Sequence, residues 1–320
     1  MEYRRLGHAG VKLSEIGLGS WLTYGGGVTP EVAADCLRTA FEAGINFIDT
    51  ADIYHRGRSE EVLGELLVDY RRQDIFLATK VFWPMSDNIN DRGLCRKHII
   101  ESIDNSLRRL RTDYVDLYQC HRFDSEVGMY EVVRTMDDLT RQGKVLYWGV
   151  SEWPALEIKN AVAMARQINA YPPVSNQPEY SIASRRVETN GAQSACDQDG
   201  LGMVVWSPLR QGILTGKYSG GAVPKDSRLA DDNQNQFVKQ IINDDVLGRV
   251  DKLRPIADRH GMSLAQLAIR WLLYRKAVTS VIIGASKPSQ VTENVNSLNY
   301  NLDEADRATI DELFPAAQFQ

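Results

Sequence analysis

The stretch INFIDTADIYHRGRSEEVLGELLVDYRRQDIFLATK, residues 45–80, decides the fold. It holds two apolar runs of strand length, residues 45–48 and 75–79, and a charged residue follows each, Asp49 and Lys80. Between them, residues 59–70 carry apolar side chains at helical spacing, which predicts a helix capped by Ser59. Two strands bridged by a helix form a βαβ unit, and its parallel strands bury both faces and push polar groups to their ends.

The same alternation continues along the whole chain. Further strands are predicted at residues 16–19, 114–119, 144–150, 173–176, 202–206 and 278–283. Eight strand–helix units without a linker predict an α/β fold, a (β/α)₈ TIM barrel that forms one domain over residues 1–320. A short N-terminal β-hairpin is expected over residues 3–15. In such barrels the active site lies at the carboxyl ends of the strands.

Helix boundaries can also be predicted from local signals. Thr29 followed by Pro30 is typical of a helix start, and Ser263 with Gln266 has capping-box spacing. One helix is expected over residues 186–198, and Pro288 opens the last predicted helix. The irregular stretch 209–236 is long enough to suggest a functional loop, and two helices are expected after it.

Composition limits the classes of function. The formal net charge is −5 and the pI is near 5.6, which disfavours nucleic acid and anionic membranes as partners. No apolar run reaches the roughly 18 residues of a membrane span, so a cytoplasmic protein is predicted. The four cysteines, Cys36, Cys95, Cys120 and Cys196, are scattered without a CxxC pair, and we expect them to be reduced.

Polar residues at the predicted strand ends suggest acid catalysis. Asp49 and Lys80 end adjacent strands at the same level of the barrel, so an ion pair between them is expected. Taken alone, this pair is as consistent with a structural role as with a catalytic one. Tyr54 follows Asp49 in a turn that can carry its phenol toward Lys80. A nearby cation lowers the pKa of a phenol, which makes Tyr54 a candidate general acid. His121 ends the fourth strand, where its ring can donate to a substrate oxygen, although a lone histidine is often only a satisfied polar residue.

The chemistry is expected to depend on a cofactor and not on a metal. The five histidines show no HxH or HExxH spacing, so no metal site is predicted. There is no GxGxxG motif for a Rossmann site. Instead, Gly284 to Lys287 lead into a helix start that can bind phosphate, and Trp206 offers a flat face for a nicotinamide ring. A plain helix cap and a core tryptophan are the alternatives.

Several segments resemble the aldo-keto reductase superfamily: GINFIDTADIY at 44–54, LATK at 77–80 and VIIGASKPSQVTENV at 281–295. Within it, YWGVSEW, WSPL and GILTGKY are most similar to the potassium-channel β-subunit branch and its microbial and plant relatives. The resemblance implies a catalytic tetrad in which Tyr54 donates the proton, Lys80 lowers its pKa, Asp49 pairs with Lys80 and His121 orients the carbonyl.

The resemblance also implies an NADP(H) site that spans the barrel top. The residues facing the nicotinamide half would be Ser20, Trp21, Asp49, Ser151, Gln177 and Trp206. Those near the pyrophosphate would be Ser207, Pro208, Leu209, Lys217 and Arg228. Those near the adenosine 2′-phosphate and adenine would be Ser286, Gln290, Glu293 and Asn294; Gly284, which begins the turn before the phosphate-binding helix start, is also expected to contact the cofactor. Preference for NADPH is expected from Ser286, Lys287, Gln290 and Arg228, which form a seat for an extra phosphate.

The expected function is reduction of a small aldehyde or ketone by NADPH, with Trp21, Tyr54, Trp83 and His121 around the substrate. Channel subunits of the branch carry asparagine where this chain has His121, and many have an amino-terminal extension that is absent here. Both differences favour a working reductase. A redox-reporting regulatory subunit with slow turnover and a metal-dependent barrel hydrolase are the alternatives. A homo-oligomer is possible, and the substrate is not predicted.

Overall fold

Eight parallel strands close into a barrel in the computed structural model, which describes residues 1–225, 227–232 and 234–319. Strand β10 pairs with both β9 and β3, which closes the ring in the order β10-β3-β4-β5-β6-β7-β8-β9. The strands are β3 (Ile16–Gly19), β4 (Phe47–Asp49), β5 (Phe76–Val81), β6 (Val115–Cys120), β7 (Val145–Ser151), β8 (Ser175–Gln177), β9 (Gly202–Val205) and β10 (Val278–Ile283). The predicted (β/α)₈ fold is confirmed.

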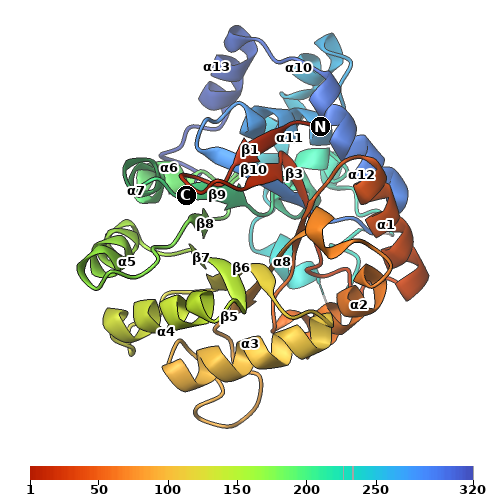
Figure 1. Cartoon of the computed structure of the whole chain (residues 1–320). Coiled ribbons are helices and arrows are strands. Elements are labelled where there is room, and N and C mark those ends of the chain that lie inside the picture. Colours follow the sequence, from red (N-terminus) through yellow and green to blue (C-terminus); the bar gives the residue numbers. More distant parts are fainter. Residues whose placement is uncertain (226, 233, 320) are drawn as a thin grey trace.

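Helices surround this barrel (Figure 1). They are α1 (Pro30–Glu42), α2 (Arg58–Leu67), α3 (Arg96–Leu110), α4 (Met129–Arg141), α5 (Ala155–Gln167), α6 (Arg186–Thr189), α7 (Ala192–Asp199), α8 (Asn235–Lys239), α9 (Asp244–Asp251), α10 (Arg254–Arg259), α11 (Leu264–Leu273), α12 (Pro288–Val295) and α13 (Glu304–Leu313). The Thr29 cap of α1 and the Ser263–Gln266 capping box of α11 are both present. No helix of the described residues is long and apolar enough to cross a lipid bilayer.

Three local predictions are wrong. Ser59 does not cap α2: its hydroxyl donates to the carbonyl of Tyr24 at 2.6 Å, and the cap position is Gly57 at φ 89°. The helix predicted over residues 186–198 is two helices, because Gly191 between them has a left-handed φ of 82°. Residues 226 and 233 of the predicted loop 209–236 lie outside the described residues, and its described part contains two short 3₁₀ helices, η3 (Arg210–Thr215) and η4 (Ser219–Gly221). Four α-helices (α8–α11) lie between η4 and β10, where two were expected.

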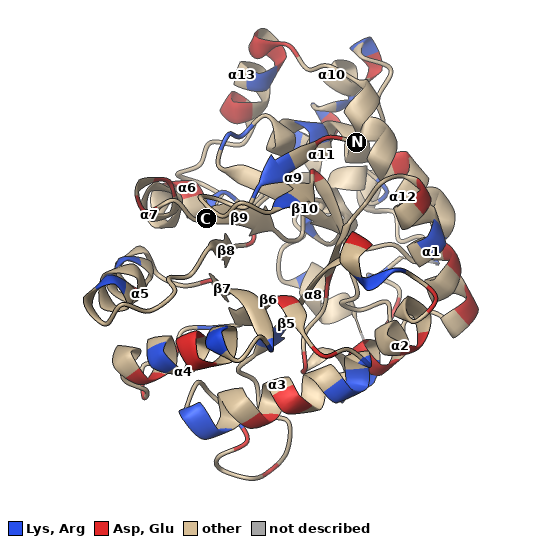
Figure 2. Ribbon diagram, viewed as in Figure 1, with Lys and Arg blue, Asp and Glu red and all other residues tan. Residues whose placement is uncertain are grey.

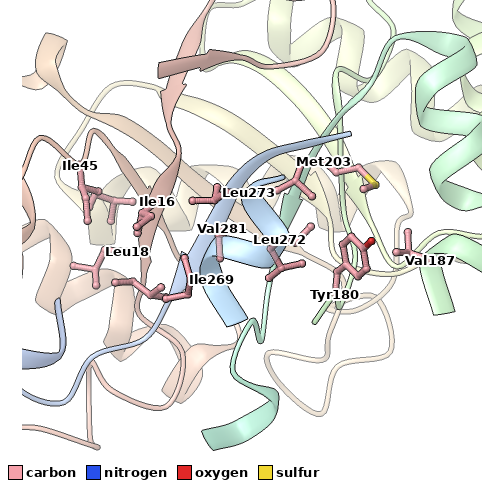
Figure 3. Close-up of a cluster of buried hydrophobic side chains, with 14 of the residues drawn as sticks. Ile16, Leu18, Ile45, Tyr180, Val187, Met203, Ile269, Leu272, Leu273 and Val281 are labelled. Atoms are coloured by element: carbon pink, nitrogen blue, oxygen red, sulfur yellow. The ribbon is translucent and has the colours of Figure 1, made fainter. Parts of the chain in front are cut away.

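The core forms two layers on opposite sides of the strands. Inside the barrel, Phe47, Phe76, Leu117, Val204 and Ile282 pack with Leu6 and Leu13. The latter two come from the predicted N-terminal hairpin, β1 (Tyr3–Arg5) paired antiparallel with β2 (Lys12–Ser14). Outside, the strands pack against helices: Figure 3 shows Ile269, Leu272 and Leu273 of α11 beside Ile16, Leu18 and Val281 of β3 and β10.

Alternation along the strands places polar side chains in the barrel's interior above the apolar layer. Successive strand residues point to opposite faces, so Asp49 shares a face with Phe47, and Lys80 shares a face with Phe76 and Ala78. The apolar residues fill the end nearer the hairpin. The carboxyl end of the barrel is therefore left for charged groups.

Candidate active site

Lys80 is the centre of a buried polar network at the carboxyl end of the barrel. Its side chain is fully buried, and its ammonium donates to Asp49 Oδ2 at 2.7 Å, to the Thr50 carbonyl at 2.7 Å and to the Tyr54 hydroxyl oxygen at 3.2 Å. These three contacts match the three N–H donors of a lysine. The predicted ion pair and the approach of Tyr54 are both present.

Asp49 is held from its other side by two amides. Gln177 Nε2 donates to Asp49 Oδ1 at 2.8 Å, and Gln119 Nε2 approaches the same oxygen at 3.4 Å. Gln119 was missed in the sequence because it lies inside an apolar strand and not after it. Gln119 lies opposite Lys80 in the pairing of β5 with β6. Side chains two residues apart in a strand share a face, so Gln119 shares the interior face of the barrel with Leu117, and this spacing could have been used to find it.

The pKa of Tyr54 corrects one expectation. Burial raises the pKa of the phenol above its ordinary value, and the Lys80 ammonium offsets only part of this rise. Burial alone would lower the pKa of Lys80, but Asp49 and Tyr54 bring it above its ordinary value, so the ammonium stays charged. The prediction of a lowered Tyr54 pKa counted the cation but omitted the loss of hydration. Tyr54 is therefore protonated at neutral pH in the free protein.

His121 lies across from Tyr54. Their ring centroids are 5.9 Å apart, and the His121 and Trp83 centroids are 6.3 Å apart. Burial lowers the pKa of His121 well below its usual range, and the charges of Lys80 and Arg122 lower it further. The imidazole is therefore neutral at pH 7, the form that can donate one hydrogen bond without carrying a charge.

Aromatic rings extend the site beyond the tetrad. Trp21 packs against Tyr54, Trp206 and Phe237 with centroid distances of 6.4, 5.8 and 5.3 Å. The Trp206 indole N–H donates to Glu152 Oε1 at 2.9 Å, which fixes the ring. Phe237 and Glu152 were not predicted, although Glu152 lies within the segment YWGVSEW (147–153), directly after Ser151.

The remaining nicotinamide-side residues lie beside the tetrad. The Ser20 N–H donates to the Asp49 carbonyl at 2.9 Å, and the Ser20 hydroxyl donates to the Thr50 hydroxyl at 2.8 Å. Ser151 donates to the Gln177 carbonyl at 2.8 Å. These contacts place Ser20, Ser151 and Gln177 along the same rim as Asp49.

A second group of predicted residues surrounds Arg228. Its guanidinium donates to Gln211, and Gln211 in turn donates to the Ser207 hydroxyl at 2.9 Å. A Cβ placed on Gly284 would lie 3.7 Å from Arg228 Nη2, so the guanidinium lies against the turn before α12. Burial lowers the pKa of Arg228. Arg228 thus brings the loop that follows β9 into contact with the turn that follows β10.

The other predicted cofactor residues are only partly brought together. Ser286 and Gln290 bond each other, backbone N–H to Oε1, at 2.8 Å. Asn294 is buried and Glu293 is exposed, with the Glu293 carbonyl accepting from Gln266 at 3.0 Å. Pro208 is buried, whereas Leu209 and Lys217 are half-buried. No hydrogen bond between described residues links the Ser286 group to the tetrad.

A buried acid pair supports the turn that carries Tyr54. Asp52 is fully buried and accepts from the Ile53 N–H at 2.6 Å and the Ser102 hydroxyl at 2.8 Å. Glu60 is also buried and pairs with Arg109 at 2.7 Å. Burial, and then repulsion from Glu60, raise the pKa of Asp52 to about 8. This acid was not singled out in the sequence.

Asp52→Asn should therefore change stability in a pH-dependent way. The folded protein holds the Asp52 proton more tightly than the unfolded chain, so this group's contribution to stability is present at low pH and is lost as pH rises from about 4 to about 8. The Tm of the variant minus that of the wild type should be larger at about pH 9 than at about pH 5. Thermal unfolding checks this, with exposed Asp69→Asn as control; equal differences at both pH values would contradict it.

The fold and the site geometry define a (β/α)₈ barrel with a buried polar network at the carboxyl ends of its strands, and comparisons with known proteins identify its family. The model of the Aldo/keto reductase family matches residues 15–314. A probable voltage-gated potassium channel subunit beta of Oryza sativa subsp. japonica is 41% identical over 301 residues, covering 93% of this chain and 92% of that protein. The protein of the same name from Arabidopsis thaliana is 41% identical over 302 residues, with the same two coverages. The chain belongs to the aldo/keto reductase family.

Proposed function

We propose that this protein reduces the carbonyl of a small aldehyde or ketone with NADPH, and that Tyr54 donates the proton. The observation that carries the proposal is the Lys80 ammonium, which contacts the Asp49 carboxylate at 2.7 Å and the Tyr54 hydroxyl at 3.2 Å in a buried site. A salt bridge kept only for stability would not need the phenol. A general acid does need such a neighbour, because the cation stabilises the phenolate that proton donation leaves behind.

The chain's own residues supply binding, orientation and the proton. The Tyr54 oxygen accepts from Lys80, so its own hydrogen is directed to another acceptor, for which we propose the substrate oxygen. Neutral His121 donates to the same oxygen and fixes its position. As negative charge develops on that oxygen, the Tyr54 proton transfers, and the Lys80 ammonium stabilises the resulting phenolate. Asp49, held by Gln177, keeps Lys80 charged and in place.

The residues fit a nicotinamide dinucleotide. Proteins of this family generally use NAD(P)H. When bound, this cofactor supplies hydride to the carbonyl carbon. Among the described residues, the Arg228 guanidinium donates to the Gln211 amide oxygen and forms no ion pair with a carboxylate, although burial disfavours its charge. A phosphate would satisfy it, and the adjacent amino end of α12 favours phosphate too.

A screen of aldehydes and ketones, followed by absorbance as NADPH is consumed, tests the reductase function. Consumption that depends on the added carbonyl supports it. Consumption of NADPH at the same rate with and without every carbonyl tried would count against it. Hydrolysis of an added substrate that needs no NADPH and that a chelator abolishes would favour the metal-dependent hydrolase instead.

Arg228→Gln should weaken the binding of NADPH more than that of NADH. Removing a charge-assisted contact to phosphate should raise the Kd of NADPH at least about tenfold. Fluorescence titration of both cofactors measures this, and exposed Lys225→Gln in the same segment changes net charge equally. Equal affinity of the wild type for the two cofactors would contradict the NADPH preference.

A second candidate function rests on the names of the relatives. Both plant proteins are named as probable channel β subunits, which favours a regulatory protein that holds its cofactor and turns over slowly. Comparing the steady-state rate with the rate of cofactor release separates the two functions. Slow release of the cofactor together with slow turnover on every carbonyl would favour the regulatory function.

A further inference from the structure

Arg122 is a charged side chain at the candidate active site that the mechanism does not use. It follows His121 directly, is half-buried, and its Nη1 donates to the His121 carbonyl at 2.6 Å. Its guanidinium carbon lies 5.7 Å from the Trp83 ring centroid. Burial lowers the pKa of Arg122, which shows that the charge is partly deprived of water. An arginine nevertheless remains protonated at neutral pH.

This guanidinium has no carboxylate partner in the part of the chain that the structure describes. The two carboxylates whose charges act on it, Glu152 and Glu179, are committed elsewhere. Glu152 accepts from Arg186 at 2.5 Å and from the Trp206 indole at 2.9 Å. Glu179 pairs with Arg210. Each of these two carboxylates thus forms an ion pair with another arginine, and neither forms one with Arg122.

Two poorly exposed arginines show the usual arrangement, whereas Arg228 at the proposed phosphate site does not. Arg185 pairs with Glu188 at 2.7 Å and Asp311 at 2.9 Å, and Arg109 pairs with Glu60 at 2.7 Å. Charges withdrawn from water are normally paired in this way, because an unpaired one is costly. Arg122 departs from that pattern at the place where a substrate would bind.

The charge of Arg122 acts on both groups proposed to hold the carbonyl oxygen. It offsets a part of the rise that burial causes in the pKa of Tyr54, and it adds to the lowering that burial and Lys80 cause in the pKa of His121; the two rings are 5.9 Å apart. Trp83 packs edge-to-face near His121 and beneath the guanidinium, which links the three side chains. Arg122 is therefore a cationic side chain next to the position that we propose for the carbonyl oxygen, between Tyr54 and His121.

We propose that the preferred substrate is an aldehyde or ketone that also carries a carboxylate, and that Arg122 binds that carboxylate. The inference rests on the proposed reductase function. One guanidinium N–H is used on the His121 carbonyl, and others are available for a planar carboxylate. The bound carboxylate would neutralise the charge of the Arg122 guanidinium and fix the position of the carbonyl group next to Tyr54. Arg122 thus sets specificity and takes no part in proton transfer.

The test compares 3- and 4-carboxybenzaldehyde with their methyl esters, which keep the ring and aldehyde but lack the charge. The wild type should show a kcat/KM at least about tenfold higher for one of the acids than for its ester, as expected for a charge-assisted contact. Arg122→Gln should reduce this ratio to near one, mainly through KM for the acid. Arg122→Lys, which keeps the charge but loses the planar fork, should give an intermediate ratio.

Arg166→Gln is the control, because it removes an exposed positive charge whose partner, Asp199, is not one of the two carboxylates that act on Arg122. It should leave the acid-to-ester ratio near that of the wild type. A wild-type ratio near one, or a ratio that Arg122→Gln does not change, would overturn the inference while the reductase function stands. A rise in the Kd of NADPH in Arg122→Gln, with the ratio kept, would overturn it as well. If the wild type consumes NADPH with neither acid nor ester nor any other carbonyl, the reductase function itself fails.

Discussion

Tyr54→Phe should lower kcat for carbonyl reduction by about 10²–10⁴-fold while leaving the Kd of NADPH nearly unchanged. The substitution removes one hydroxyl and keeps the ring that packs against Trp21 and His121. The loss is specific to proton donation, since neither Lys80 nor neutral His121 can replace the phenol: Lys80 is occupied by Asp49 and Thr50. Steady-state kinetics and fluorescence titration of NADPH measure the two quantities.

A control variant distinguishes the loss of the proton donor from a general disturbance of packing in the site. Tyr218→Phe removes a buried phenol hydroxyl outside the tetrad and should cost far less activity. Unchanged kcat in Tyr54→Phe would rule out Tyr54 as the acid. A parallel loss of NADPH affinity would show instead that the phenol supports the cofactor site.

The site also explains which features a sequence can predict. The barrel follows from eight short apolar runs, because buried parallel strands must be apolar whatever the loops do. Asp49 and Lys80 could be found because each lies at the end of such a run. Gln119 could not be found in that way, since it interrupts a strand and faces Asp49 only through the register between β5 and β6.

Other predictions were wrong because they depend on tertiary contacts. Ser59 has the composition of a helix cap, yet the Tyr24 carbonyl lies close enough to take its hydroxyl. The pKa of Tyr54 depends on how much of the site is withdrawn from water, which no local pattern records. The same holds for Arg122: that its neighbours Glu152 and Glu179 are paired with other arginines is visible only in three dimensions.

Figure 2 shows acidic and basic residues interspersed along the outer helices α3 and α4, in agreement with the small net charge. Each exposed ion pair contributes little to the free energy of unfolding, because water and salt screen its charges. Lys97 and Glu101 of α3 form such a pair, and both side chains are more than half exposed. The Asp49–Lys80 pair differs, since both side chains are buried, and it is where a single substitution should have the largest effect on stability.

Lys80→Met should lower both activity and stability. It leaves the Asp49 carboxylate buried with only the Gln177 and Gln119 amides, and breaking a buried pair in this way costs about 3–5 kcal/mol in the free energy of unfolding. Activity should fall at least as far as in Tyr54→Phe, because the phenolate loses its stabilising charge. Chemical denaturation and kinetics on the purified variant measure both effects.

The double variant Asp49→Asn with Lys80→Met distinguishes a structural pair from a catalytic one. Removing the second charge eliminates the uncompensated carboxylate, while an asparagine oxygen can still accept from Gln177, so most of the lost stability should return. Activity should not return, because the ammonium beside Tyr54 is still absent. If stability and activity recovered together, Lys80 would act only through the integrity of the fold. If the double variant stayed as unstable as Lys80→Met, the unpaired Asp49 charge would not be the cause. A stable, correctly folded and inactive double variant is the result that the Lys80–Tyr54 contact at 3.2 Å leads us to expect.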